Sequence, residues 1–360
     1  MKILVGLSGG VDSAVTAYLM KKAGHDVIGA TMAIWDKNNR AFSHLTTADA
    51  CFSPHEEQDI EAARKICEII GIPYHTIDCT GIYKQTVLAN FKEEYMSGRT
   101  PNPCVWCNAK IKFKALPDAA CQAGIDFDKF ATGHYARILF DAETNRYRLL
   151  RGVDPKKDQS YFLYRLTQDQ LAEILFPLGE KTKTEIRDIA RTAGLPVSDK
   201  PDSQDFYSGD INDILQEAPR SGNFVMKDGT VMGKHNGFWN YTIGQRKGLG
   251  ISAPAPLYVI GFDKDNNNVI VGFEDENVCH FLIAENLCWA SIEPPEKPFK
   301  AFVKIRSSQP PTPVLVTPLS ADEIKIDFEL NQRGIASGQS AVLYDGDLVI
   351  GGGIIKKSGK

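Results

Sequence analysis

The sequence predicts an α/β fold in which a doubly wound parallel sheet is followed by a small central β-rich domain and a C-terminal β-barrel. In the first half, short apolar runs alternate with stretches of helical periodicity, the pattern of a parallel sheet covered by helices. Beyond about residue 205, short apolar or alternating runs are separated by Gly, Asp, Asn and Pro, which is typical of antiparallel β modules. A break near residue 280 divides these modules, so we expect domains at 1–204, 205–279 and 280–360.

The opening unit reads as a strand, a glycine turn and a helix. Residues 3–7 are apolar, as in a strand buried on both faces, and from Ser13 apolar residues recur at helical spacing up to Gly24. Between them stands S-G-G-V-D-S, residues 8–13. Gly-Gly alone also suits a plain tight turn. With its hydroxyls and Asp12, however, this turn predicts a phosphate-binding site at a helix N-terminus, where Asp12 can hold magnesium.

The remaining elements continue the same alternation. Strands are expected at 26–32, 72–77 and 127–132 and a helix at 56–70, and T-K-T-E at 182–185 is a capping-box start for another helix. Ligands of such a sheet bind at the carboxyl ends of its strands. The expected C-terminal strands are 256–262, 268–271, 301–305, 323–328 and 340–344.

Composition is that of a globular protein with two or three domains. The chain has 360 residues, of which 24% are charged, and a net charge of -4, so a nucleic-acid partner must be held by local patches. The longest apolar runs are too short to span a membrane or to form a signal peptide, and we expect a cytoplasmic protein. In a reducing compartment the eight cysteines do not predict a disulfide framework.

A second informative stretch is G-R-T-P-N-P-C-V-W-C-N at 98–108. Asn102 can cap a helix whose first residue is Pro103, which places Cys104 and Cys107 on one face of its first turn. The helix N-terminus is expected to lower the pKa of these thiols. Three roles are open: a metal pair, a sulfur-carrying nucleophile and two buried cysteines. Arg99, Lys110, Lys112 and Lys114 flank the thiols and suggest a phosphate-binding strip.

Several longer motifs carry a resemblance to known proteins. Residues 8–13 resemble the PP-loop of the N-type ATP pyrophosphatases, which cut ATP between its α- and β-phosphates, and no Walker lysine follows. G-R-T-P-N-P at 98–103, A-T-G-H-Y-A at 131–136, K-D-Q-S-Y-F-L at 157–163, D-S-Q-D at 202–205 and Y-T-I-G-Q-R-K-G-L-G at 241–250 occur in an order that resembles the bacterial tRNA-specific 2-thiouridylases. The resemblance covers nearly the whole chain. It implies an adenine nucleotide α hydrolase-like first domain, with ATP, Mg²⁺ and tRNA as ligands.

The resemblance also implies roles for individual residues. His134 would contact tRNA, although it could equally be a capping or core histidine, and residues 157–159 could be a tRNA-contacting loop or an exposed charged turn. The run 241–250 could be a hairpin that merely packs or a surface that follows the RNA backbone. ATP would be held by Gly6, Leu7, Ser8, Gly9, Gly10, Val11, Asp12, Ser13, Met32 and Gly133, and tRNA by His134, Lys157, Asp158, Gln159, Arg306, Ser307 and Gln339.

The reaction implied is 2-thiolation of the wobble uridine of tRNA. ATP adenylates the C2 carbonyl oxygen, which is otherwise a poor leaving group, and sulfur then displaces AMP. Cys107 is the expected central sulfur residue, and a cysteine desulfurase, a sulfur relay protein or free sulfide would supply the sulfur. The alternatives are another adenylating enzyme of the same fold, such as an ammonia-using ligase, and a non-catalytic nucleotide- or RNA-binding module.

One departure from the family concerns the second thiol. Tyr207 stands where many members have a persulfide-carrying cysteine, while this chain has Cys51 and Cys104 in addition to Cys107. Three cysteine ligands leave one iron of a four-iron cluster open to bind sulfide. The sequence therefore favours an iron–sulfur cluster on these three residues. The alternative is a persulfide on Cys107, alone or paired with Cys104, with Cys51 packing in its loop.

Overall fold

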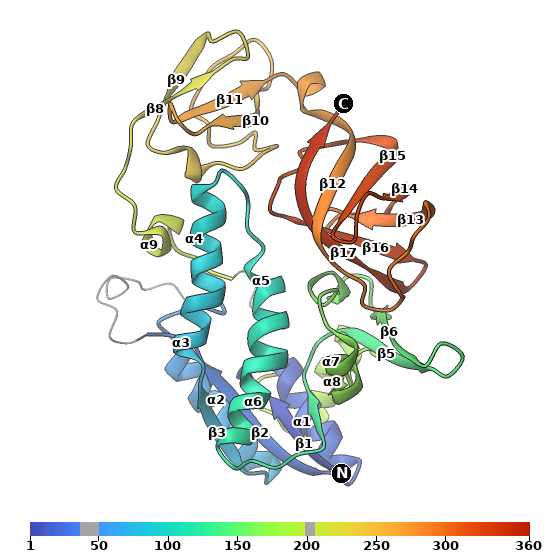
Figure 1. Ribbon diagram of the computed structural model, residues 1–360. Helices are drawn as coiled ribbons and strands as arrows, with labels where there is room; N and C mark the ends of the chain where they lie inside the picture. The colour runs from blue at the N-terminus through green and yellow to red at the C-terminus, as the bar shows by residue number, and fades with distance from the viewer. Residues whose placement is uncertain (37–49, 199–205) are drawn as a thin grey trace.

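The computed structural model describes residues 1–36, 50–198 and 206–360, and its first domain is built on five parallel strands in the order β3-β2-β1-β4-β7 (Figure 1). With β1 in the middle, the chain winds first to one side and then to the other, which confirms the predicted doubly wound sheet. The predicted strands lie within a few residues of the observed ones. The bounds are β1 (Lys2–Gly6), β2 (Asp26–Ala33), β3 (Tyr74–Asp78), β4 (Lys129–Ala131) and β7 (Ile174–Leu175).

Helices cover both faces of this sheet because alternate residues of β1 point to opposite sides. Ile3 and Val5 pack with α1 and α2, whereas Leu4 packs in the larger core that contains α5 and the helices around it. The predicted capping box is confirmed: the Glu185 N–H donates to Thr182 Oγ1 at 3.3 Å. One layer contains α1 (Val11–Lys22), α2 (Glu56–Ile70) and α8 (Lys183–Thr192), and the other α3 (Thr80–Tyr83), η2 (Lys84–Leu88), α4 (Ala89–Met96), α5 (Pro103–Trp106), η3 (Cys107–Ala115) and α6 (Leu116–Gln122).

The central domain is a four-stranded sheet ordered β10-β11-β8-β9, as the β texture of this region predicted. The segment 241–250, for which a hairpin was one expectation, instead forms turns without strands. Glycines at 244, 248 and 250 adopt positive φ there, which disfavours a regular strand. The elements are α9 (Ile211–Leu215), β8 (Gly222–Val225), β9 (Val231–His235), η5 (Phe238–Asn240), β10 (Tyr258–Asp263), β11 (Asn268–Gly272) and η6 (Glu274–Asn277).

The C-terminal domain is a closed six-stranded antiparallel barrel, because β12 pairs with both β15 and β17. The hairpin of β5 (Ala136–Asp141) and β6 (Arg146–Arg151) leaves the first domain and joins this sheet beside β17. Because β12 begins at Val278, it starts just before the predicted boundary at 280, and the three domain ranges stay predictions. The barrel strands are β12 (Val278–Cys288), β13 (Phe299–Lys304), β14 (Thr312–Pro318), β15 (Glu323–Arg333), β16 (Ser340–Asp345) and β17 (Leu348–Gly359).

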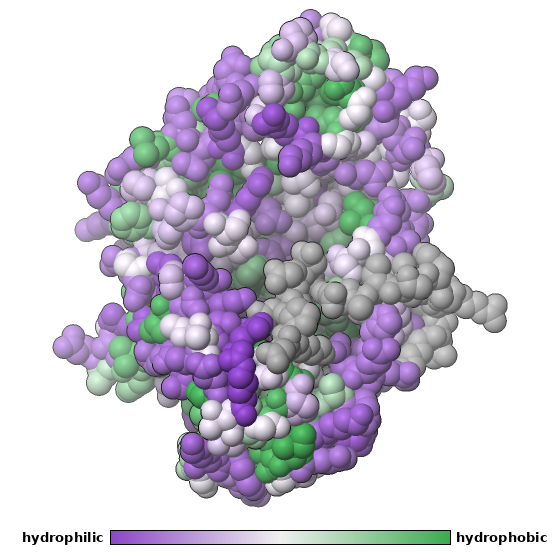
Figure 2. Space-filling model, turned by 180° about the vertical axis from the view of Figure 1, so that it is seen from behind, coloured by the Kyte–Doolittle hydropathy of each residue, from purple (hydrophilic) through white to green (hydrophobic). Residues whose placement is uncertain are grey.

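The helices α4 and α5 of the first domain lie on its side toward the other two domains. Figure 1 shows α4 running from the first domain toward the central domain, with the barrel beside the β5–β6 hairpin. The face shown in Figure 2 is mainly hydrophilic, with apolar side chains in separate small areas. Among the described residues, no helix has the length and apolar character needed to cross a membrane.

Candidate functional site

The predicted phosphate loop lies between β1 and α1, at the carboxyl edge of the sheet. Gly9 has a φ of +69°, and a Cβ there would lie 2.6 Å from the Asp59 carbonyl oxygen, so only glycine fits. Ser13 Oγ accepts from the Ser8 N–H at 3.2 Å and donates to the Gly10 carbonyl at 3.1 Å. The first hydrogen bond within α1 runs from the Ala14 N–H to Gly10. The N–H groups ahead of it have no acceptor within the helix and can bind an anion.

Other predicted ATP residues lie at the same edge. A Cβ on Gly133 would lie 2.8 Å from the Asp12 carbonyl carbon and 2.9 Å from the Ser13 nitrogen, so the chain leaving β4 packs directly on the loop. Met32 is half-buried near the end of β2, the neighbour of β1. The edge thus combines the loop with residues from both adjacent strands, as predicted for a nucleotide site.

Asp12 forms an ion pair that the sequence did not predict. Lys183 Nζ donates to both carboxylate oxygens of Asp12 at 2.8 Å, and the Tyr135 hydroxyl donates to Oδ1 at 2.7 Å. The Lys183 side chain is 11% exposed. Lys183 is the first residue of α8, directly after the capping Thr182. Its position at a helix N-terminus is the signal in the sequence that could have suggested a role at a binding site. A magnesium ion held by Asp12 would share its carboxylate with this ammonium group.

Cys107 is buried in the core of the first domain. Burial raises the pKa of its thiol to about 11, and the nearby Lys112 only partly opposes this. The expectation that the helix N-terminus lowers the thiol pKa is therefore wrong for Cys107, because desolvation outweighs the dipole. Asn102 and Pro103 take the predicted cap and first-turn positions, and Cys104 is half-buried.

Cys51 lies beside the segment that carries Tyr207. The N–H of the next residue, Phe52, donates to the Phe206 carbonyl at 3.0 Å, and the Tyr207 hydroxyl donates to Asp213 at 2.7 Å. Negative charge on Cys51 raises the pKa of Cys107, which places the two within electrostatic reach. Nevertheless, no three His, Cys, Asp or Glu side chains within 1–36, 50–198 and 206–360 are arranged to hold one metal ion. The D-S-Q-D run at 202–205 lies outside the described residues.

Lys112 differs in exposure from the two lysines beside it: it is half-buried, whereas Lys110 and Lys114 are exposed. Burial lowers the pKa of Lys112, but negative charge on Cys107, Cys51 and Cys104 raises it by more. Lys112 is five residues after Cys107 in the π-helix η3, whose i→i+5 hydrogen bonds bring such residues to similar faces. Lys110 and Lys114 are exposed, and Lys114 pairs with Asp118 at 3.1 Å.

His134 packs among aromatic side chains directly after Gly133. Its ring lies 5.4 Å from that of Phe113, and Nδ1 is 2.8 Å from Thr132 Oγ1. Burial and Lys112 hold the pKa of His134 well below its usual value. Lys112 therefore influences the pKa of both His134 and Cys107.

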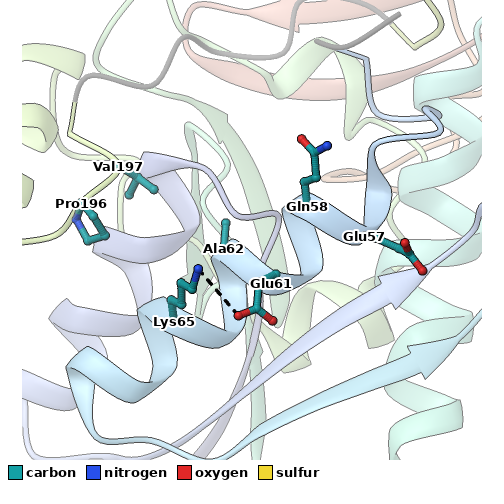
Figure 3. Close-up of a pocket in the computed structure, with 7 residues that line it drawn as sticks. All are labelled: Glu57, Gln58, Glu61, Ala62, Lys65, Pro196 and Val197. Carbon is teal, nitrogen blue, oxygen red and sulfur yellow. Dashed lines mark ion pairs between the residues drawn. The ribbon is translucent and has the colours of Figure 1, made fainter. Parts of the chain in front are cut away.

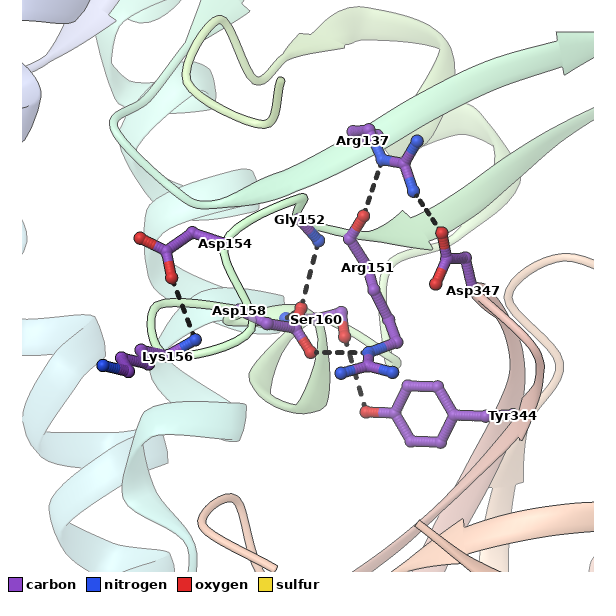
Figure 4. Close-up of polar contacts among 9 residues, drawn as sticks. All are labelled: Arg137, Arg151, Gly152, Asp154, Lys156, Asp158, Ser160, Tyr344 and Asp347. Atoms are coloured by element: carbon purple, nitrogen blue, oxygen red, sulfur yellow. Dashed lines mark hydrogen bonds and ion pairs between the residues drawn. The ribbon is translucent and has the colours of Figure 1, made fainter. Parts of the chain in front are cut away.

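Residues of the predicted tRNA loop at 157–159 form hydrogen bonds within the protein, and Figure 4 shows those of Asp158. The Asp158 carboxylate is 1% exposed and accepts from Arg151, from the Gly152 N–H and from the Ser160 N–H. Gln159 Oε1 accepts from the Tyr135 N–H at 2.9 Å. Two of the three side chains therefore shape this turn, and Lys157 is half-exposed beside them.

The remaining predicted tRNA residues belong to the barrel. Arg306 and Ser307 are exposed, and Arg306 donates to the Gly334 carbonyl at 2.9 Å. A Cβ on Gly244 of the central domain would lie 3.4 Å from the Arg306 guanidinium, so this cation stands at the junction of two domains. Gln339 contacts the first domain instead, at the segment before Cys104.

A separate pocket of about 530 Å³ lies along α2 (Figure 3). Its polar lining is two glutamates, one glutamine and one lysine, and the lysine pairs with Glu61. None of the predicted ATP residues lines it, so we do not assign it to the nucleotide. Its lining residues are Glu57, Gln58, Glu61, Ala62, Lys65, Pro196 and Val197.

Comparison with known proteins places this architecture in a family. Residues 1–207 match the family described as tRNA methyl transferase HUP domain, 210–273 the tRNA methyl transferase PRC-barrel domain and 279–355 the aminomethyltransferase beta-barrel domain. The chain is 51% identical over 357 residues to a protein of Endomicrobium trichonymphae named tRNA-specific 2-thiouridylase MnmA, covering 99% of both chains. It is 42% identical over 364 residues to a protein of that name from Clostridioides difficile, covering 99% of this chain and 98% of the relative.

Similarity to solved structures is much lower. A 4-thiouridine synthetase in complex with RNA and ATP is 17% identical, with a TM-score of 0.35, over 56% of this chain and 42% of the other. A TM-score this low carries no argument about ligands.

Proposed function

The chain belongs to the tRNA-specific 2-thiouridylase family, and we infer that it uses ATP to replace the C2 oxygen of the wobble uridine of tRNA with sulfur. The observation that carries this inference is the match over 99% of the chain to proteins of that name, together with the glycine loop at the carboxyl edge of the sheet. The phosphate loop is in contact with Gly133, and Lys112 acts electrostatically on both His134 and Cys107.

The first step needs stabilisation of negative charge on phosphate. The uridine O2 attacks the α-phosphorus of ATP, a P–O bond to the β-phosphate breaks, and pyrophosphate leaves. The N–H groups at the start of α1 and the ammonium of Lys183 support this step, because both place positive charge beside residues 8–13. Mg²⁺, if bound at Asp12, would neutralise part of the phosphate charge. The second step is attack of sulfur at C2 with AMP as leaving group.

Recognition of tRNA is proposed for the surface between the central domain and the barrel. Arg246 and Lys247 are exposed in the turns of 241–250, and Arg306 stands at the same junction. Cations in this arrangement suit the phosphates of RNA even though the whole chain is acidic. Chemistry on a single base further requires that the base leave its stack and enter the pocket.

Cys107 is the proposed sulfur carrier. The iron–sulfur cluster predicted on Cys51, Cys104 and Cys107 has partial support, since their charges act on a common group, Lys112. However, the described residues form no three-ligand set. The cluster therefore does not fit the present arrangement, and no step is assigned to it. A desulfurase or a relay protein would deliver sulfane sulfur to Cys107 as a persulfide, and a second thiol, for which Cys104 is available, would then release the thiolated base and form a disulfide with Cys107. Free sulfide is already at the oxidation level of the product and would attack C2 directly, without passing through Cys107.

The function is tested by incubating the protein with ATP, sulfide and unmodified tRNA. We expect pyrophosphate release that depends on tRNA, and 2-thiouridine in the digested RNA by mass spectrometry. The same tRNA already carrying 2-thiouridine is the matched control and should not stimulate release. Release driven by a small carboxylate and ammonia, or no release with any substrate, would contradict the proposal.

A further inference from the structure

The segment between α4 and α5 has no helix or strand of its own, yet it leads directly into the helix of Cys104. Its conformation is fixed by the barrel loop, residues 335–339, which connects β15 to β16. The Thr100 N–H donates to the Ser337 carbonyl at 2.7 Å. Gln339 Nε2 donates to the carbonyls of Thr100 at 3.1 Å and of Pro101 at 2.8 Å. Three hydrogen bonds therefore hold two consecutive residues of this segment.

Gly338 allows the barrel loop to approach this closely. Its φ is +89°, and a Cβ there would lie 2.7 Å from the Thr100 carbonyl oxygen and 2.9 Å from its nitrogen. The Glu94 carboxylate lies at a similar distance. Two backbones are thus in direct contact, so any side chain at 338 would push the loop away from the segment.

Contacts on either side strengthen this junction. Arg99, whose side chain is 23% exposed, donates to Glu94 in α4 at 2.7 Å and to Glu285 of barrel strand β12 at 3.1 Å. The Tyr161 hydroxyl donates to the Ser340 carbonyl at 3.0 Å, which ties the end of the barrel loop to the first domain. The barrel therefore contacts the first domain directly before α5, the helix that contains Cys104.

We propose that Gln339 and Gly338 are positioning residues for sulfur transfer: through the Thr100–Pro101 backbone they set where α5 begins and hence where Cys104 and Cys107 stand. The inference rests on the proposed function. It assigns the amide N–H groups of Gln339 to the protein rather than to the predicted tRNA contact, because both of them donate to carbonyls of the first domain. Displacement of a reacting group by about 1 Å is enough to lower a rate by roughly 100-fold.

The test pairs two variants with matched controls. Gln339→Glu keeps the shape but replaces the donating amide by a carboxylate facing two carbonyls. Gln332→Glu makes the same change at a half-buried residue of barrel strand β15, outside the loop. Gly338→Ala adds a methyl group against Thr100, whereas Gly346→Ala adds it at a positive φ with open space. Each protein is checked for folding by its melting temperature. Hydrogen–deuterium exchange of 98–106 is measured without tRNA, along with tRNA affinity and the single-turnover thiolation rate.

In Gln339→Glu and Gly338→Ala we expect exchange in 98–106 to rise and the thiolation rate to fall by about 10-fold or more, with tRNA affinity within about 2-fold of wild type. Both controls should behave as wild type. Wild-type exchange together with weakened tRNA binding would overturn the proposal and make Gln339 a tRNA contact. Because exchange is read without substrate, it reports on the junction even if the wild-type protein does not thiolate tRNA, which separates failure of this inference from failure of the proposed function.

Discussion

Lys183 Nζ lies 2.8 Å from each carboxylate oxygen of Asp12, so the N-termini of α8 and α1 are joined by an ion pair inside the phosphate loop. The Tyr135 hydroxyl donates to the same carboxylate and lies under the lysine. Through the Lys183 N–H, which donates to Asp154 at 3.0 Å, the pair is also connected to the turn that precedes residues 157–159. Asp12 is therefore both a candidate metal ligand and a structural partner of the nearest cation.

Asp12→Asn and Lys183→Met are each expected to abolish thiolation while the protein remains folded. Loss of a hydrogen bond between charged groups should reduce the free energy of unfolding by about 2 kcal/mol, less if water enters the site. Lys181→Met, two residues earlier, is the control and should be fully active. Activity is measured as 2-thiouridine formed, and stability by urea unfolding.

The double variant separates the structural role of the pair from its chemical role. If the pair is a unit, the two stability losses should fail to add, with a coupling of at least about 0.5 kcal/mol. Undiminished thiolation in Asp12→Asn would reject the assignment of Asp12 to the phosphate site.

The lysines of η3 should differ in function because they face different surroundings. Lys112→Met is expected to lower the thiolation rate strongly without changing the salt dependence of tRNA binding, since Lys112 is half-buried and interacts electrostatically with the thiols. Lys110→Met with Lys114→Met removes two exposed cations, and the slope of log affinity against log salt should fall by up to about 0.9 for each RNA phosphate that these lysines neutralise. An unchanged slope in the double variant would show that these two lysines are only a solvated face.

Iron analysis and cysteine variants distinguish sulfur delivery by an iron–sulfur cluster from delivery by a persulfide. With an iron–sulfur cluster, anaerobic reconstitution with iron and sulfide should give a coloured, iron-containing protein, and Cys51→Ser should lose both the iron and the activity. Cys121→Ser changes another exposed thiol, distant in sequence, and should have neither effect. An iron-free protein that still thiolates tRNA would leave Cys107 as a persulfide carrier.

His134 should make stability depend on pH. Its pKa is depressed in the fold, so below the unfolded value of about 6.5 only the unfolded chain takes up the proton, and stability falls as the pH falls from 7 to 5. His134→Gln removes this contribution, and its loss of stability over that range should be smaller than that of wild type. The exposed His280, changed to Gln, is the control. Equal pH dependence in wild type and His134→Gln would contradict the assignment.

The sequence by itself determined the order of elements and the chemistry of their ends. The helix at 56–70 is found with the predicted bounds, and the phosphate loop and the Thr182 capping box lie where predicted, because all three are encoded by residues close together in the chain. Local patterns suffice when hydrogen bonds form between neighbouring residues. The family resemblance on motifs from the whole chain likewise predicted the sequence of three domains.

Only the tertiary structure decided what surrounds each candidate residue. The burial that raises the pKa of Cys107 and the pairing of Lys183 with Asp12 each depend on groups from distant elements. The same holds for Gln339, more than 200 residues from the Thr100 and Pro101 carbonyls that it contacts. Desolvation and long-range pairing depend on which surfaces come into contact when the domains pack. These contacts cannot be predicted from residues that are close together in the sequence.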